Sequence, residues 1–425
     1  MREFQMSTCN EEQQGRPMRT SPATPPRLMT LILLIGLSVV SLNMFLPSLA
    51  NIAAEFQADY ALVNLSIAAY AAMTAVLQLI VGPLSDRFGR RRVILSAIGI
   101  FLLVSLGCLL ATDIWTFLAC RMLQAAIITG YTVSLAVIRD SSTAEKAASL
   151  MGYMAMAWAL APMLGPMAGG TLDELFGWRA SFWAFLGMGS VIFCLCWFDL
   201  GETNMSPSDT FAAQLRSYPE LYRSRRFWGF ALCLAFSTGA FYTFLGGAPL
   251  VAKAVFQIST AELGVYMGTI TAGFVFGSFL SGRFAARFEL TTMMIAGRLV
   301  ACTGLVIGLA LLFLGIVNLY FFFTACACVG VGNGLTMPSS NAGAMSVRPE
   351  LAGSAAGLSG ALTVGGGAVM SAITGTILTE ENAAVALLAM MLLSSVLGLL
   401  AALYVWWVDK TEAASKPHVT RQDIL

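Results

Sequence analysis

Long apolar stretches, each of roughly 18–25 residues, alternate with short clusters of charged residues along most of this chain. A helix of that length, rising 1.5 Å per residue, crosses the ~30 Å hydrocarbon core of a bilayer. Backbone groups in lipid must find hydrogen-bond partners within their own segment, so these stretches are predicted to be helices rather than barrel strands. We expect twelve spans, near residues 29–50, 61–84, 93–112, 114–138, 147–171, 180–200, 227–250, 262–282, 293–315, 318–341, 353–378 and 382–407.

Composition excludes most other classes of protein. Of the 425 residues, 57% are hydrophobic and 11% are charged, whereas soluble domains carry about 25% charged residues. The net charge of +1 says nothing about nucleic acid, but the sequence has no basic stripe with interleaved aromatic residues, so no nucleic-acid partner is expected. The single histidine, His418, stands in the polar tail, and the nine cysteines are scattered mainly through apolar stretches. We therefore expect no metal site, no cofactor and no enzyme activity.

The distribution of basic residues predicts the orientation. With the N-terminus in the cytoplasm, the loops on that side receive the arginine clusters at 87–92, 216–226 and 283–287, and both tails are basic. The opposite side receives only Arg179 and Lys253, together with several acids. Cytoplasmic loops of membrane proteins carry an excess of lysine and arginine. Both termini are therefore predicted to be cytoplasmic, in a multi-pass protein of a bacterial inner membrane.

The chain is predicted to consist of two similar halves. A polar segment at 201–226 separates a six-span half at 29–200 from a second at 227–407, with tails at 1–28 and 408–425. Leu84–Phe88 (LSDRF) and Leu280–Phe284 (LSGRF) occupy the same place in each half. Two repeats related by an axis along the membrane normal, with a site between them near the midplane, are typical of transporters.

The first cytoplasmic loop, Gly82–Arg92, reads GPLSDRFGRRR. It resembles the signature loop of the major facilitator superfamily, which implies a major facilitator fold of twelve helices in two six-helix pseudo-repeats. The resemblance makes Gly82, Asp86, Arg87, Gly89 and Arg90 parts of a cytoplasmic gate. In the family, the acid at the Asp86 position meets the N-terminus of the eleventh helix, which would begin near Gly353 and Ser354. We hypothesise that Asp140 joins Asp86 and Arg90 in this gate; a solvated loop pair is the alternative.

The fifth span contains Gly165–Gly170, which reads GPMAGG. It resembles the antiporter motif of drug:proton exporters in the superfamily, carried here by Gly165, Pro166, Gly169 and Gly170. Proline removes a backbone donor and bends a helix, while small residues let a neighbouring helix approach closely. Ordinary small-residue packing would account for any one of these positions alone.

Arg121 is the only charge that we predict to lie deep inside a span, and a charge there is costly enough to suggest a function. With Gln124 it resembles the family's Arg-x-x-Gln-Gly motif, whose arginine is implicated in proton coupling, although Ala125 replaces the glycine.

Ser41–Leu49 (SLNMFLPSL) resembles the Bcr/CflA-like multidrug resistance branch, with Asn43 where that branch has aspartate. Asparagine cannot titrate. Further candidates for the central cavity are Tyr70, Gln78, Tyr131, Tyr242, Tyr266, Asn333 and Asn341.

These resemblances imply a monomeric secondary active transporter, which exports small hydrophobic or amphipathic compounds, drugs included, by alternating access. Proton exchange is the implied energy source. The alternative is a proton-independent facilitator or an organic-anion carrier that uses Arg121 to bind the anion of the substrate. The sequence has no Gly-x-x-x-x-Gly-Lys-Ser/Thr loop, so direct use of ATP is not expected.

Overall fold

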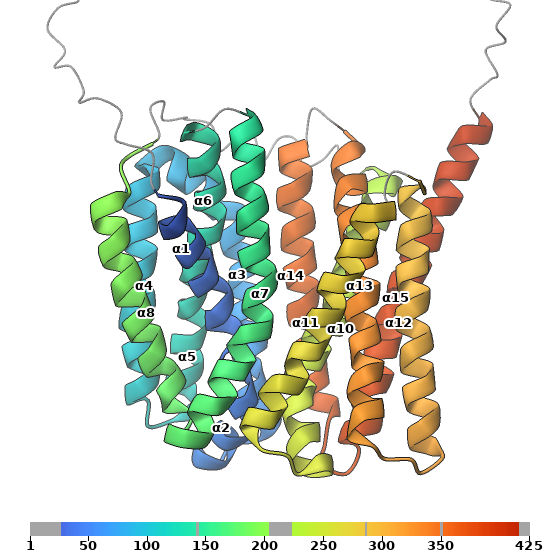
Figure 1. Cartoon of the computed structure of the whole chain (residues 1–425), viewed down its shortest axis with the longest axis horizontal. Helices are drawn as coiled ribbons and strands as arrows, with labels where there is room; N and C mark the ends of the chain where they lie inside the picture. The colour runs from blue at the N-terminus through green and yellow to red at the C-terminus, as the bar shows by residue number, and fades with distance from the viewer. Residues whose placement is uncertain (1–26, 142–143, 204–222, 285–286, 349–351, 416–425) are drawn as a thin grey trace, which may run out of the picture.

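The computed structural model describes residues 27–141, 144–203, 223–284, 287–348 and 352–415. In these ranges the regular structure is helical, and the helices run side by side (Figure 1). Leu28, which opens the first helix, and Ser415, which closes the last, lie at one end of the bundle, here called the tail end. The opposite end is called the far end.

The described residues of the N-terminal half form six crossings, two of which are interrupted by a turn of 3₁₀ helix. They are α1 (Leu28–Asn43) with η1 (Leu46–Ser48) and α2 (Leu49–Glu55); α3 (Tyr60–Phe88); α4 (Arg90–Leu110); α5 (Ile114–Gln124) with η2 (Ala125–Ile127) and α6 (Ile128–Ser141); α7 (Ala144–Phe176); and α8 (Arg179–Asp199). The first interruption coincides with Pro47, which lacks the amide donor that a continuous helix needs. Asn43 therefore lies at the last turn of α1, directly before the break.

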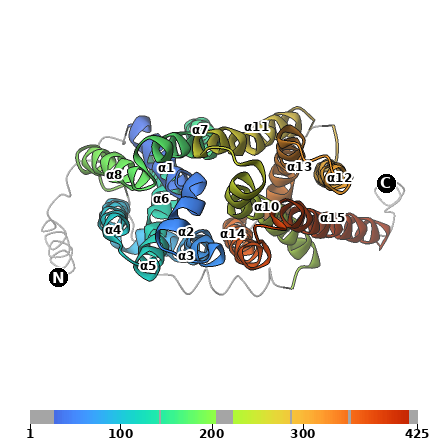
Figure 2. The ribbon, with the colours of Figure 1, turned by 90° about the horizontal axis from the view of Figure 1, so that it is seen from below.

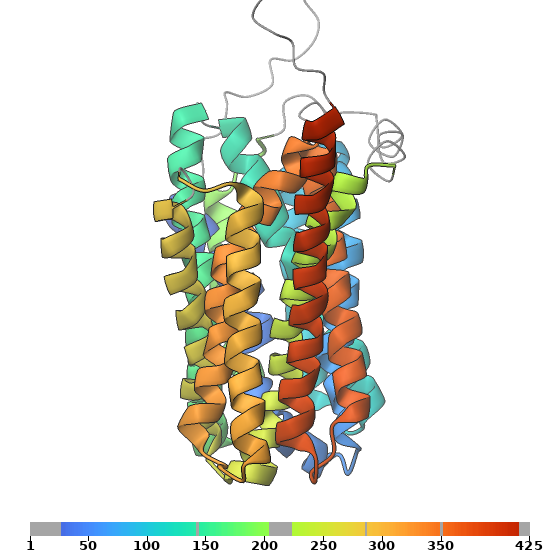
Figure 3. The same cartoon turned by 90° about the vertical axis from the view of Figure 1, so that its right-hand side faces the viewer.

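In the C-terminal half, the part of the chain that the structure describes forms the other six crossings. They are α10 (Arg225–Val251), which continues into a short π-helical turn, η3 (Ala252–Phe256); α11 (Thr260–Phe284); α12 (Leu290–Phe313); α13 (Leu319–Ser346); α14 (Ala352–Ile377); and α15 (Ala383–Ser415). Figure 3, which faces this half, shows α12 and α15 on its outer side.

Among the described residues, 11 helical stretches are long and apolar enough to cross a membrane. The remaining crossing is α7, whose 33 residues run from one end of the bundle to the other. The prediction of an all-α membrane fold is thus confirmed. Several boundaries differ from those expected: α7 ends at Phe176 and α13 at Ser346, while α10 starts at Arg225 and α15 continues to Ser415. The ion pair between Arg226 Nε and Asp409 Oδ1, at 2.7 Å, joins the extensions of α10 and α15. Most of the expected linker, 204–222, lies outside the described residues.

The two halves meet along two pairs of helices, α3 with α14 and α7 with α11 (Figure 2). At the far end, hydrogen bonds cross between the halves. Tyr60 Oη donates to the carbonyl oxygen of Gly246 at 2.6 Å, and Asn64 Nδ2 donates to that of Ser371 at 2.6 Å. We call these contacts, together with those between α7 and α11 described below, the far-end seal.

Candidate functional site

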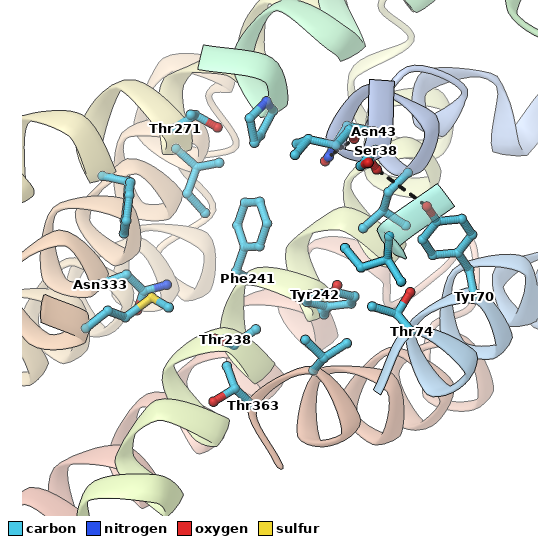
Figure 4. Close-up of a pocket in the computed structure, with 18 of the residues that line it drawn as sticks. Ser38, Asn43, Tyr70, Thr74, Thr238, Phe241, Tyr242, Thr271, Asn333 and Thr363 are labelled. Atoms are coloured by element: carbon cyan, nitrogen blue, oxygen red, sulfur yellow. Dashed lines mark hydrogen bonds between the residues drawn. The ribbon is translucent and has the colours of Figure 1, made fainter. Parts of the chain in front are cut away.

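A cavity of about 230 Å³ lies between the two halves (Figure 4). Its wall on α3 is formed by Tyr70, Thr74 and Gln78, which follow Tyr60 and Asn64 along the helix, so the cavity lies on the tail-end side of the far-end seal. Most of the wall is apolar. Its polar side chains are Ser38, Asn43, Tyr70, Thr74, Gln78, Thr238, Tyr242, Thr271, Asn333 and Thr363. None of the described residues that line the cavity is charged.

Several residues that the sequence pointed to lie in this wall: Asn43, Tyr70, Gln78, Tyr242 and Asn333. The structure places others elsewhere. Asn341 is exposed, because it lies eight residues beyond Asn333 on α13, about 12 Å nearer the tail end. On α6 the wall residue is Ile128, and the half-buried Tyr131 does not line the cavity. The Tyr266 ring stacks on Phe323, with 4.8 Å between the ring centroids, and does not line it either.

Arg121 and Gln124 are both fully buried behind the cavity wall. Arg121 Nη1 donates to the carbonyl oxygen of Ser41 at 3.2 Å and to Gln124 Oε1. The guanidinium carbon lies 4.0 Å from the centroid of the Phe45 ring and 5.0 Å from that of Tyr70. Within the described ranges no carboxylate lies at salt-bridge distance from this arginine, whose charge is balanced only by carbonyl, amide and ring electrons.

Tyr70 connects the buried arginine to the cavity. Its hydroxyl shares a 2.7 Å hydrogen bond with Ser41 Oγ, while Ser41 supplies the backbone carbonyl that Arg121 contacts. A polar chain therefore leads from the cavity wall to Arg121. Any movement of α1 that shifts Ser41 must also change the surroundings of the arginine.

A second buried arginine was not predicted from the sequence, so the prediction that Arg121 is the only charge deep in a span is wrong. Arg298, on α12, is 0% exposed. Its Nε donates to Thr336 Oγ1 at 3.0 Å and its Nη2 to Asn333 Oδ1 at 2.6 Å. Asn333 Nδ2 in turn donates to the carbonyl oxygen of Ser237 at 3.0 Å. The signal was available, because Arg298 is the sixth residue of the apolar stretch expected at 293–315.

Asn43 has one satisfied and one unsatisfied end. Its Nδ2 donates to the carbonyl oxygen of Val39 at 2.8 Å, one helical turn earlier. Its Oδ1 is buried without a hydrogen-bond partner among the described atoms, and the residue is only 3% exposed. A buried acceptor left unpaired is costly, which makes this oxygen a candidate for contact with water or a ligand in the cavity.

The proposed gate loop forms a compact turn between α3 and α4. Gly89 has a φ of 95°, a conformation that glycine adopts without strain. Asp86 Oδ1 lies 2.5 Å from Arg90 Nη2, and the backbone amide of Arg90 donates to Glu202 Oε1 at 2.8 Å. The structure therefore brings Asp86, Gly89 and Arg90 together.

For the other residues predicted to form the gate, the structure shows fewer contacts or none. Gly82 is half-buried in the last turns of α3, and Arg87 is exposed, with its guanidinium carbon 5.5 Å from the centroid of the Phe88 ring. The side chains of Asp140 and Ser354, and the surroundings of Gly353, lie outside what the structure describes. The role of Asp140 in a gate, and the contact of Asp86 with the eleventh helix, stay predictions.

The antiporter-like motif lies on α7 where that helix meets both α1 and α11. A Cβ on Gly169 would lie 1.5 Å from the backbone oxygen of Met44, and one on Gly170 would lie 2.1 Å from that of Thr260. Thr260 Oγ1 also donates to the carbonyl oxygen of Gly170 at 3.2 Å. The motif thus allows backbone contact within the N-terminal half and across the far-end seal. Its four residues, Gly165, Pro166, Gly169 and Gly170, are all buried.

Two six-helix halves around a central cavity define the class of secondary transporters. The chain belongs to the Major Facilitator Superfamily, whose family model matches residues 31–371. It is thus a multi-pass protein of the bacterial inner membrane.

Named relatives and a solved structure agree with this assignment. The chain is 30% identical over 403 residues to the uncharacterized MFS-type transporter YdgK of Bacillus subtilis (strain 168), covering 90% of this chain and 97% of that protein. It is 28% identical over 282 residues to the multidrug transporter MdfA of Yersinia pestis (strain D106004), covering 66% and 69%. The fold is similar to that of a bacterial homolog of the human lysosomal transporter Spinster, in an inward-facing and unoccupied conformation. That match has a TM-score of 0.73 and 16% identity, and covers 90% of this chain and 96% of that one.

Proposed function

We propose that the protein exports small, uncharged, hydrophobic or amphipathic compounds, drugs among them, by alternating access and in exchange for protons. The observation that carries this proposal is the cavity wall, which is mostly apolar and has no charged side chain among its described residues. Pockets of this kind bind apolar ligands and orient them with a few polar groups. A charged substrate would lose its hydration there without gaining a partner. The similarity to a multidrug transporter points to the same class of substrate.

Alternating access requires that the two halves separate at either end of the bundle. If the tails lie in the cytoplasm, as the basic loops predict, the far-end seal closes the outer side and the cavity is reached from the cytoplasm. The seal depends on a few hydrogen bonds and on glycine-mediated contact between α7 and α11. Such contacts are weak enough individually to break and reform in each cycle.

Two features support proton exchange. The motif on α7 resembles that of drug:proton exporters, and its Gly170 lies at a contact between the halves that would have to change in each cycle. Arg121 lies beside the cavity, linked to it through Ser41 and Tyr70. A buried cation whose surroundings differ between two conformations can favour or oppose protonation of groups nearby.

A proton-independent facilitator is the second candidate, and one observation favours it. Asn43 stands in the wall where an acid would serve to carry a proton, and the described wall contains no carboxylate. An organic-anion carrier that uses Arg121 has less support, because the guanidinium is fully buried against Phe45, Tyr70 and Phe182 rather than exposed in the cavity.

Reconstitution in liposomes with an internal pH dye separates these candidates. A gradient of each compound from a panel of neutral drugs and small organic anions would be imposed, and solute and proton fluxes would be recorded together. We expect neutral compounds to drive protons in the opposite direction, and Arg121→Ala to abolish the proton flux. Protein-free liposomes control for leakage. Solute flux without proton movement would refute exchange and favour the facilitator, while competition by organic anions would contradict the neutral substrate class.

A further inference from the structure

Each half of the protein contributes one buried asparagine to the wall of the central cavity. Asn43, on α1, and Asn333, on α13, lie on either side of Phe241 (Figure 4). Both are almost fully buried, at 3% and 4% exposure. An asparagine amide can present either an acceptor oxygen or a donor nitrogen, and the hydrogen-bond partners decide which.

The partner of Asn333 is a group that can only donate. Arg298 Nη2 lies 2.6 Å from Asn333 Oδ1, and a guanidinium has no acceptor. The oxygen of Asn333 must therefore face Arg298, away from the cavity, and its nitrogen must take the other side. One N–H of that nitrogen is used by the carbonyl oxygen of Ser237. The second remains for the cavity, toward which Figure 4 shows the nitrogen directed.

The partner of Asn43 is a group that can only accept. The carbonyl oxygen of Val39 lies 2.8 Å from Asn43 Nδ2, so the nitrogen must face the backbone. Asn43 Oδ1 is then left without a partner among the described atoms, on a residue that lines the cavity. The two asparagines are thus held in opposite senses, with an acceptor on the wall of the N-terminal half and a donor on the wall of the C-terminal half.

We propose that this pair selects substrates that carry a hydrogen-bond donor at one end and an acceptor at the other. The donor binds Asn43 Oδ1, the acceptor binds the free N–H of Asn333, and an apolar body lies between them beside Phe241. Arg298 does not touch the substrate; it is a positioning residue that fixes the sense of the Asn333 amide. This inference rests on the proposed function, since it names the chemistry of the compounds that the cavity carries.

The expected selectivity follows from the cost of unpaired polar groups. A ligand that lacks the donor leaves Asn43 Oδ1 without a partner, and one that lacks the acceptor leaves an N–H of Asn333 unpaired. Sites built around hydrogen bonds reject analogues that lack the matching group, because the buried partner loses its bond. We expect each deletion to weaken binding by roughly tenfold or more.

A matched ligand set tests this selectivity. 4-Hydroxyacetophenone carries a phenol donor and a ketone acceptor at opposite ends of one ring; 4-methoxyacetophenone lacks the donor, and 4-ethylphenol replaces the ketone with an ethyl group of similar shape. Binding of tritiated 4-hydroxyacetophenone, and of longer hydroxyaryl ketones, to the full-length protein in lipid nanodiscs would be measured in competition with the two partners. We expect the bifunctional ligands to bind roughly tenfold more tightly than either partner.

Two variants assign each preference to one asparagine. Asn333→Asp keeps an oxygen for Arg298 but removes both N–H donors, so the preference for the ketone over the ethyl group should disappear while that for phenol over methoxy remains. Asn43→Leu should do the reverse. Each variant is therefore the control for the other, and survival of one preference shows that the protein is folded.

The positioning role of Arg298 needs its own test. Arg298→Met frees the Asn333 amide to rotate, so only the preference for the ketone should fall, and Arg298→Lys should restore part of it because lysine also donates. Equal binding of all three wild-type ligands, or loss of both preferences in each single variant, would overturn the inference. Compounds that are carried without this selectivity would leave the proposed function standing, whereas a wild-type protein that neither binds nor carries any neutral compound would refute that function itself.

Discussion

Replacing Gly264 with alanine should open the far-end seal. Gly264, on α11, faces the antiporter-like motif of α7, and a Cβ added there would lie 2.3 Å from the carbonyl oxygen of Pro166 and 3.0 Å from the Cα of Met167. Both neighbours are backbone atoms, which cannot move aside as a flexible side chain can. Alanine at this position therefore requires α7 and α11 to separate.

The size of the effect follows from the cost of overpacking. Extra methyl groups forced into a packed interface cost about 1–3 kcal/mol. Only the conformation in which α7 and α11 touch at the far end bears this cost, because the clash is relieved when the halves separate there. The equilibrium between closed and open far ends should then shift toward the open state by about 5–150-fold.

Hydrogen–deuterium exchange of the protein in nanodiscs measures this shift without labels. Faster exchange is expected in the last turn of α7 and the first turn of α11, which the seal covers. Gly268→Ala is the matched control, since it lies one turn along the same helix face and its Cβ would meet Met163 Cγ at an ordinary 3.4 Å. Unchanged exchange in Gly264→Ala, or an equal effect in Gly268→Ala, would refute the reasoning.

Three further substitutions test other parts of the structure. Asn43→Asp puts a titratable group in the cavity wall and should make substrate flux in proteoliposomes depend steeply on pH; a flat profile would contradict this. Gly89→Ala combines a φ of 95° with a Cβ 2.3 Å from Glu202 Oε2 and should destabilise the protein by about 1–3 kcal/mol, seen as a lower melting temperature; an unchanged one would argue against strain. Tyr60→Phe removes the 2.6 Å bond to Gly246, worth about 0.5–1.5 kcal/mol, and should raise far-end hydrogen exchange slightly; slower exchange would be unexpected.

Much of the fold could be predicted because a bilayer leaves few options for a chain of this kind. Apolar length alone locates most crossings, and the repeated LSDRF and LSGRF segments indicate two halves. The helix ends were less predictable. The last helix continues to Ser415 although its last residues are polar, because the Arg226–Asp409 ion pair and the contact of Lys410 with Trp406 stabilise an extension that hydropathy does not reveal.

The candidate site was predicted only in part, since a cavity depends on the direction in which each side chain points. Asn43 was predicted because it belongs to a motif, and Tyr242 because it is an aromatic residue in an apolar helix. Asn341 looked equivalent to Asn333 but lies about two helical turns nearer the tail end. Arg298 was missed because its place near the start of an apolar stretch resembles a boundary residue, and only the packing of α12 against α13 shows that it is buried.

The two buried arginines suggest how a neutral cavity can still recognise its substrate. Arg298 contacts the wall residue Asn333 directly, and Arg121 is linked to the wall residue Tyr70 through Ser41, so both charges lie behind the surface that a substrate would touch. A charge in the wall itself would favour ions and repel uncharged compounds. A charge behind the wall instead fixes the direction of a polar group, which lowers the entropy that binding must otherwise lose. Because Asn43 and Asn333 belong to different halves, relative motion of the halves would carry these two oriented amides apart. A substrate held between them would then lose one of its two bonds during the transition, which gives a physical reason for release after the cavity changes sides.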